Sequence, residues 1–233
     1  KGFDFVDSLY FDSGSSAYLG VLDDGRYWDT ALLGNALQES GFPAAELRPT
    51  VDYLLAIQSS NNGFPFGVDF WSAPDTDDTA ETLLFLAAHR DAPKALRRGE
   101  LAVRWLETMQ GSDGGWGAFA RNNDGNCLLR GAAGSLGDSS DLFDESSPDV
   151  TGHVLEALAI WGRDRTNSAT ARAAIEYLKS TQSPFGGWWG RWGVNYVYGT
   201  SAVVVGLVHS GEGPSLPYLK RALDWLESRQ NPD

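Results

Sequence analysis

Residues 101–119 read LAVRWLETMQGSDGGWGAF, and close variants of this stretch recur along the chain. In each copy an aromatic-leucine pair stands five residues before a glutamine, at Tyr53, Trp105, Tyr177 and Trp225. A Gly-Gly-Trp turn follows the second and third copies, whereas the first has the shorter Asn62-Gly63-Phe64. Apolar residues three or four apart lead up to each aromatic, so each copy is expected to end an amphipathic helix that glycine terminates.

A second recurring phrase precedes each copy by about thirty residues. It consists of Asp or Thr followed by an apolar stretch, which is typical of an N-capped helix buried nearly all round. The four instances are Asp29-Thr30-Ala31, Asp78-Thr79-Ala80, Asp149-Val150-Thr151 and Tyr198-Gly199-Thr200. Residues 27–233 are therefore predicted to form four helical hairpins, each with an inner apolar and an outer amphipathic helix. Residues 1–26 have no assignment, and residues 121–148 are expected to form a long loop over the rim.

Composition excludes several classes of protein. The 233 residues have a net charge of −13, which repels phosphate backbones, so no nucleic-acid partner is expected. A single cysteine, Cys127, excludes an internal disulfide and a multi-cysteine zinc site, and a reducing compartment is the default. No apolar run approaches the roughly 18 residues that a spanning helix needs.

The densest polar feature is the run Asp75-Thr76-Asp77-Asp78 at the start of an apolar helix. An acidic N-cap explains one carboxylate, but three cannot all ionise cheaply beside an apolar cavity, so one is expected to hold a proton and act as an acid. A magnesium site at Asp77, Asp78 and Glu81 is the weaker alternative because no second ligand cluster is evident. A curved array places the inner-helix N-termini on one rim, which brings His153 towards these acids.

Aromatic residues near the predicted rim form a second group, and they contrast with the repeated Trp105, Trp116, Tyr177 and Trp225, which are expected to fill the core. An apolar pocket with an acid at one end and aromatic walls suits protonation of an alkene and guidance of the resulting carbocation. The candidates are Trp28, Phe64, Phe66, Phe119, Trp192 and Tyr198.

From about Tyr27 onward the chain resembles the bacterial squalene-hopene cyclases, which are class II triterpene cyclases. The resemblance rests on the glutamine-tryptophan repeats and on four strings: residues 75–80 (DTDDTA), 114–119 (GGWGAF), 149–156 (DVTGHVLE) and 190–200 (GRWGVNYVYGT). It implies an all-α fold of α/α barrels (toroids), of which this chain holds an incomplete part. It also implies cyclisation of squalene or a related polyene without a metal or an organic cofactor.

Residue by residue, the resemblance makes Asp77 the proton donor, tuned by Asp75 and Asp78 and paired with His153. It places Trp28, Phe66, Trp192 and Tyr198 in the cavity that folds the polyene. Oxidosqualene relatives carry cysteine in the position of Asp78 and open an epoxide, so Asp78 favours an unactivated alkene. The sequence departs from the family at Phe119, where some members have tyrosine, and over residues 121–148.

The resemblance further implies a monotopic protein on the cytoplasmic side of a bacterial membrane, and it allows a homodimer. Three other functions stay open on the sequence. One is cyclisation of another polyprenyl substrate, such as oxidosqualene or a prenyl diphosphate. Another is a non-catalytic toroid that binds an apolar or protein ligand. The third is glycan hydrolysis, which also uses carboxylates and aromatics.

Overall fold

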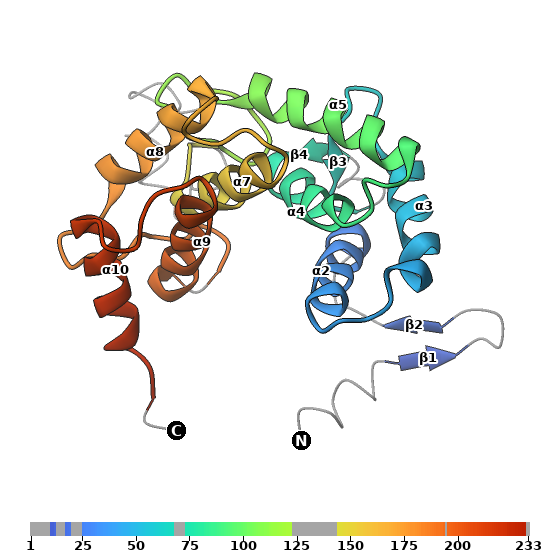
Figure 1. Ribbon diagram of the computed structural model, residues 1–233, viewed down its shortest axis with the longest axis horizontal. Helices are drawn as coiled ribbons and strands as arrows, with labels where there is room; N and C mark the ends of the chain where they lie inside the picture. Colours follow the sequence, from blue (N-terminus) through green and yellow to red (C-terminus); the bar gives the residue numbers. More distant parts are fainter. Residues whose placement is uncertain are drawn as a thin grey trace, which may run out of the picture.

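Paired helices in two layers make up the fold (Figure 1). The computed structural model describes residues 10–12, 17–19, 25–67, 73–122, 144–193 and 195–231. The inner helices are α2 (Arg26–Glu39), α4 (Thr76–Ala87), α7 (Pro148–Ile160) and α9 (Asn195–His209). The outer helices are α3 (Arg48–Ile57), α5 (Pro93–Met109), α8 (Ala169–Thr181) and α10 (Pro217–Glu227). An outer helix follows each inner helix, which confirms the predicted all-α array of hairpins.

Consecutive inner helices contact one another, α2 with α4, α4 with α7 and α7 with α9. Figure 1 shows that the array bends into an arc, with the outer helices on its convex side. The hydrophobic core lies between the layers, where Trp116, Trp188 and Phe85 are fully buried. Among the described helices, none has both the length and the apolar character that crossing a membrane requires.

Short elements fill the connections. The 3-10 helix η1 (Ala44–Leu47) leads into α3, and β3 (Phe64–Pro65) pairs antiparallel with β4 (Pro74–Asp75). Strands β1 (Tyr10–Asp12) and β2 (Ala17–Leu19) also pair antiparallel. The rest of the unassigned segment 1–26, apart from its last two residues, lies outside the described residues, as do residues 123–143 of the predicted rim loop.

The repeated glutamines join neighbouring repeats. Gln58, Gln110 and Gln182 each donate from Nε2 to the carbonyl four residues further on, at 2.7–2.8 Å. The same nitrogen donates to a second carbonyl in the next outer helix at 2.8–3.1 Å, which belongs to Arg98, Thr170 or Tyr218 respectively. Each glutamine thereby satisfies buried carbonyls of two hairpins at once, which explains why this residue type recurs at this position.

Two boundary predictions were wrong in detail. The outer helix α5 ends because Gln110 turns to an extended conformation (ψ 128°), and Gly114 (φ +93°) closes the turn that follows, so glycine does not end the helix itself. The inner helix α2 begins at Arg26, which puts Asp29 in the first turn and not at the cap. Competing local geometry at helix ends makes such boundaries hard to fix from sequence.

Burial of the inner helices depends on their place in the arc. Helices α4 and α7 have an inner neighbour on both sides and are buried nearly all round, as predicted. The same prediction is wrong for α2 and α9, which have such a neighbour on one side only. Leu33 on α2 is 60% exposed, and Val205 and Val208 on α9 are exposed as well.

Glycines let α7 and α9 approach until their main chains touch. A Cβ on Gly152 would lie 2.7 Å from the carbonyl oxygen of Ala202, and one on Gly206 would lie 2.3 Å from the oxygen of Gly152. Any side chain at either position would force the helices apart. Gly152 directly precedes His153, so this contact fixes the height and rotation of the imidazole relative to α9.

Candidate active site

The acidic run is fixed by hydrogen bonds at the start of α4. Asp75 caps the helix, its Oδ1 accepting from the backbone N of Asp78 at 2.8 Å. Thr79 Oγ1 donates to the Asp75 carbonyl at 2.6 Å and accepts from the backbone N of Phe64 at 2.8 Å, which ties the run to β3. Thr76 donates from Oγ1 to the Gly117 carbonyl at 2.7 Å. The three carboxyl groups are therefore held in place, and none is more than 6% exposed.

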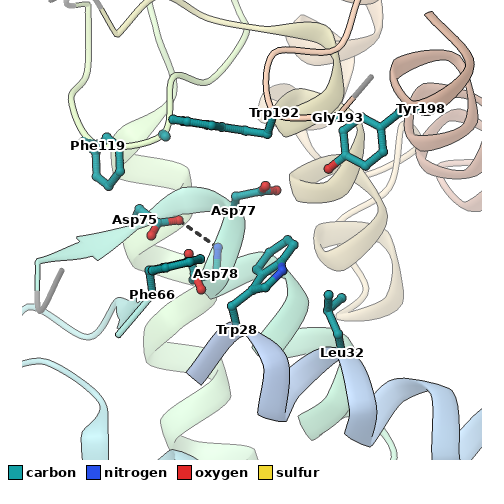
Figure 2. A pocket seen from close by; sticks show the side chains of 11 residues that line it. Trp28, Leu32, Phe66, Asp75, Asp77, Asp78, Phe119, Trp192, Gly193 and Tyr198 are labelled. Atoms are coloured by element: carbon teal, nitrogen blue, oxygen red, sulfur yellow. Dashed lines mark hydrogen bonds between the residues drawn. The ribbon is translucent and has the colours of Figure 1, made fainter. Parts of the chain in front are cut away.

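A cavity of about 550 Å³ opens over these acids (Figure 2). Its lining comes from five separate parts of the chain: α2, the 64–67 connection, the start of α4 with the residue before it, the turn after α5, and the segment from Trp192 to Tyr198 in α9. Repeat geometry therefore brings together residues that are far apart in sequence. The lining residues are Trp28, Leu32, Phe66, Asp75, Asp77, Asp78, Ala118, Phe119, Trp192, Gly193 and Tyr198.

Two of the predicted site residues lie outside this lining. Phe64 is fully buried in the core and does not face the cavity, so its prediction as a substrate-contacting residue was wrong. Its backbone N donates to Thr79 Oγ1 at 2.8 Å, which holds Phe64 against α4 with its ring in the hydrophobic core. His153 stands behind Asp77 on α7, where its ring meets the edge of Tyr198 at a centroid distance of 5.9 Å.

His153 and Asp77 form a close pair. Nδ1 of His153 lies 2.7 Å from Oδ1 of Asp77. Burial lowers the pKa of His153, but the Asp77 carboxylate and its hydrogen bond, with further acids nearby, raise it more, to about 9. While Asp77 is ionised, the imidazole is therefore charged at neutral pH and donates its Nδ1 hydrogen to Asp77. A cationic donor stabilises the carboxylate that remains after Asp77 releases a proton.

Asp75 and Asp78 are neighbouring buried carboxyl groups that both line the cavity. Burial raises the pKa of Asp75 to about 7, although hydrogen bonds from Asp78 oppose the change. Burial and the Asp75 charge raise the pKa of Asp78 well above its usual range. Asp78 is thus the protonated partner and Asp75 the acceptor. Oδ1 of Asp78 is buried without a hydrogen-bond partner, as expected of a neutral carboxyl group.

Two further aspartates position the aromatic walls, and the sequence analysis did not identify either as a site residue. Asp144 accepts hydrogen bonds from the backbone N–H groups of residues 118–120 and pairs with Arg191 at 3.1 Å. Asp149 Oδ2 accepts from the backbone N of Arg191 at 2.7 Å and of Trp192 at 3.2 Å. Asp144 thereby fixes Phe119, and Asp149 fixes Trp192.

Among the described residues, no group of three or more His, Cys, Asp or Glu side chains has an arrangement suited to a metal ion. Asp77 is engaged by His153 and Asp78 by Asp75, so the carboxylates of the weaker magnesium alternative do not converge on a common point. The geometry instead supports a buried Brønsted acid under an aromatic cavity.

Comparison with known proteins matches this geometry to a family. The family model for the squalene-hopene cyclase C-terminal domain matches residues 25–233. This chain belongs to the squalene-hopene cyclase family. The match begins just before α2 and covers all four hairpins of the cyclase-family chain.

Two curated relatives show the range of this cyclase family. Over 207 residues the chain is 38% identical to the squalene-tetrahymanol cyclase of Tetrahymena thermophila, covering 87% of this chain and 31% of that protein. Over 197 residues it is 39% identical to the squalene-hopene cyclase of Alicyclobacillus acidocaldarius, covering 77% of this chain and 31% of that protein. The chain spans about a third of the length of these relatives.

Solved structures share the fold. The type II terpene cyclase MstE from Scytonema superposes with a TM-score of 0.62 at 21% sequence identity, covering 88% of this chain and 56% of that protein. Its complex with geranylgeranyl dihydroxybenzoate gives a TM-score of 0.63 at 20% identity, covering 88% and 55% of the two chains. The helical hairpin array of the cyclase-family chain is therefore the α/α-barrel architecture that the sequence predicted.

Proposed function

We propose that this chain supplies the proton donor and part of the cavity for cyclisation of a polyene, with squalene as the substrate. The observation that carries the proposal is the position of Asp77, which lines the aromatic cavity while its Oδ1 is held 2.7 Å from charged His153. The names of curated relatives, among them squalene-hopene and squalene-tetrahymanol cyclases, support squalene as the substrate.

In the proposed reaction, Asp77 gives its carboxyl proton to the end carbon of a terminal alkene. The alkene electron pair forms the new C–H bond and leaves a cation on the neighbouring carbon, which the remaining double bonds attack in turn. Loss of a proton or capture of water ends the sequence. Trp28, Phe66 and Trp192 offer π faces that stabilise positive charge without acting as nucleophiles.

The cavity favours an uncharged hydrocarbon over a prenyl diphosphate. No lysine or arginine is among the described residues that line it. Arg191, which precedes the lining residue Trp192, is paired with Asp144 and stacks over Trp192 at 5.0 Å. A diphosphate would have to break this pair or bury its charge beside three carboxyl groups.

Membrane association and a homodimer stay predictions from the family resemblance. A polyene of this kind is insoluble in water, so the protein has to take it from an apolar phase. We therefore propose that the substrate comes from a membrane surface on the cytoplasmic side. Sedimentation of the protein with phospholipid vesicles tests this step, and a protein that stays entirely in the supernatant contradicts it.

The proposed function is tested by incubating the protein with squalene and identifying products by mass spectrometry. Because the chain supplies only part of the cavity, we expect residues 1–233 alone to be inactive, so the assay uses a longer protein in which the rest of the cavity is present. In that protein we expect cyclised triterpene from the parent and none from Asp77→Asn, because an amide of the same size cannot protonate carbon. His153→Ala is expected to lower the rate by about a hundredfold, since the acid remains but loses its orienting cation.

Asp52→Asn is the matched control, because Asp52 is exposed on α3 and far from the cavity. It should retain the parent rate. Substantial cyclisation by Asp77→Asn would remove Asp77 from its proposed role. Parallel incubations with a prenyl diphosphate and with an oligosaccharide separate this proposal from the two other enzymatic alternatives.

A further inference from the structure

A catalytic acid that gives its proton to a hydrocarbon has to be reloaded before the next turnover. The final proton of a cyclisation leaves from the product, some distance from Asp77. The cavity side of Asp77 is walled by aromatic side chains and filled by substrate or product. The proton that reloads Asp77 is therefore expected to arrive from the side that faces away from the cavity, where His153 lies.

Behind Asp77, one imidazole nitrogen faces two carboxyl groups. Nδ1 of His153 lies 2.7 Å from Asp77 Oδ1 and 3.8 Å from Glu81 Oε1. Glu81 follows Asp77 by four residues on α4, which places both side chains on the same face of that helix. The same nitrogen can thus give a proton to one carboxylate and take one from the other.

His153 and Glu81 begin a row of titratable groups that continues through Glu156 on α7 to His209 on α9, away from the cavity. Glu156 follows His153 by three residues, and its Oε1 lies 3.0 Å from Nδ1 of His209, at the end of α9. The Glu81 and Glu156 side chains are 10% and 15% exposed, whereas that of His209 is 45% exposed. Titratable groups therefore run from the buried acid to the surface at the C-terminal ends of the inner helices.

We propose that Glu81, Glu156 and His209 return a proton to Asp77 through His153 after each turnover. This inference rests on the proposed function. Glu81 and Glu156 are thus positioning residues for proton supply and do not touch the substrate.

Each step moves one proton and leaves the row in its starting state. His153 gives its Nδ1 proton to the Asp77 carboxylate and becomes neutral. Glu81 reloads His153, Glu156 reloads Glu81, with which it interacts electrostatically, and His209 reloads Glu156 across their 3.0 Å contact. His209 then takes a proton from solvent, so each cyclisation consumes one solvent proton at the surface and returns one when the product is deprotonated.

The surroundings of the row suit groups that exchange protons near neutral pH. Burial raises the pKa of Glu81 to about 7, helped by Asp77 and Glu156 and opposed by His153. Burial also raises the pKa of Glu156, which His209 and His153 oppose and Glu39 of α2 assists. From α2, Asn35 Nδ2 donates to Glu81 Oε2 at 3.2 Å and holds the carboxyl group in line.

The experiment compares the first turnover with the steady state in Glu156→Gln and His209→Ala, using the same protein preparation as the squalene assay at one fixed pH. The first turnover uses the proton already on Asp77, so its rate and amplitude should equal those of the parent. Later turnovers should slow by about tenfold or more. Added imidazole should restore the steady-state rate of His209→Ala, because diffusible imidazolium can donate the proton that His209 supplied and then take another from solvent.

Glu100→Gln is the matched control, since Glu100 pairs with Arg163 at 2.7 Å and lies on outer helix α5. It should leave both phases unchanged. Three results would overturn the inference: a parental steady state in both row variants, an equal loss in the first turnover, or an equal loss in Glu100→Gln. A parent without cyclisation activity would instead refute the proposed function itself.

Discussion

Three contacts hold the Trp192 ring at the mouth of the cavity. Its backbone N–H donates to Asp149, the Arg191 guanidinium stacks over the ring at 5.0 Å, and Phe119 meets its edge at 6.5 Å. The side chain is nonetheless 50% exposed, so its position depends on these contacts more than on packing. The ring is thus aimed at the cavity while it leaves room for substrate.

We expect Trp192→Leu to release partly cyclised products along with a slower rate. Loss of a cation–π contact worth about 2 kcal/mol corresponds to roughly thirtyfold in rate, enough to redirect a branching cation. Mass spectrometry of the product mixture is the measurement. Trp189→Leu is the control, because Trp189 is 42% exposed and outside the cavity lining. If Trp192→Leu gave only the fully cyclised product of the parent, Trp192 would contribute to substrate binding and would not stabilise a cation.

The sequence was most informative about side chains whose neighbours are close in the chain or related by the repeat. The run Asp75 to Asp78 was found from its own density, and His153 from the repeat register. Glu81 was considered only as a metal ligand, since its role depends on a contact with His153 that comes from packing of α4 on α7. Asp144 was missed because it follows an irregular stretch without periodicity.

At the scale of the element, the acids of α4 couple its stability to pH. In the folded state the pKa values of Asp75 and Glu81 rise to about 7 from ordinary values near 4, because both are buried. The native state then binds more protons than the unfolded state between pH 4 and 7. The contribution of these two groups to the free energy of unfolding is fully present below pH 4 and is lost as pH rises through 7. The free energy of unfolding falls by up to about 1.4 kcal/mol per pH unit for each proton.

The free energy of unfolding in urea should therefore fall from pH 5 to pH 7. His153 continues the fall towards pH 9, because its folded pKa of about 9 exceeds the ordinary 6.5. Asp78→Asn should flatten the slope between pH 5 and 7, since it removes one of the raised carboxyl groups. Asp52→Asn, at an exposed site, should keep the parent slope. Stability that rises over this range would contradict the assignment.

The glutamine link between hairpins is the second feature at this scale. Gln110→Ala removes two hydrogen bonds and leaves the carbonyls of Gly114 and Thr170 without their partner. We expect a loss of about 1–3 kcal/mol in the free energy of unfolding. Gln230→Ala is the matched control, because the same residue type in the fourth copy is exposed. Equal losses in urea titrations of the two variants would show that the cross-hairpin bonds contribute little.

For the whole molecule, the repeat predicted the arc but not the difference between its middle and its ends. Periodicity reports that an inner helix is apolar on every side, and it does so equally for all four copies. Whether each side finds a neighbour depends on position in the array. The central helices α4 and α7 met that expectation, whereas Leu33 of α2 and Val208 of α9 stayed exposed.

These two exposed faces should make the 233-residue chain self-associate, because apolar patches at the ends of a repeat array attract one another in water. Leu33→Glu combined with Val208→Glu should lower the average mass measured by light scattering at equal concentration. Leu96→Glu is the control, since Leu96 is exposed on α5, an outer helix in the middle of the array. A parent that is monomeric at all concentrations would refute this prediction and weaken the case for a homodimer.

The main-chain contact of α7 with α9 also bears on how a product departs. Two helices that already touch at Gly152 and Gly206 cannot slide or part without exposing their buried main chains. The side of the cavity that Tyr198 of α9 lines is therefore rigid, whereas the Trp192 ring marks a more open side, because it is half-exposed. In the proposed reaction, a rigid polycyclic product would pass through the opening beside Trp192 more slowly than the flexible polyene substrate. The residence time of the bound product should therefore lengthen with each ring formed. Product release, as well as proton donation by Asp77, would then influence the turnover rate.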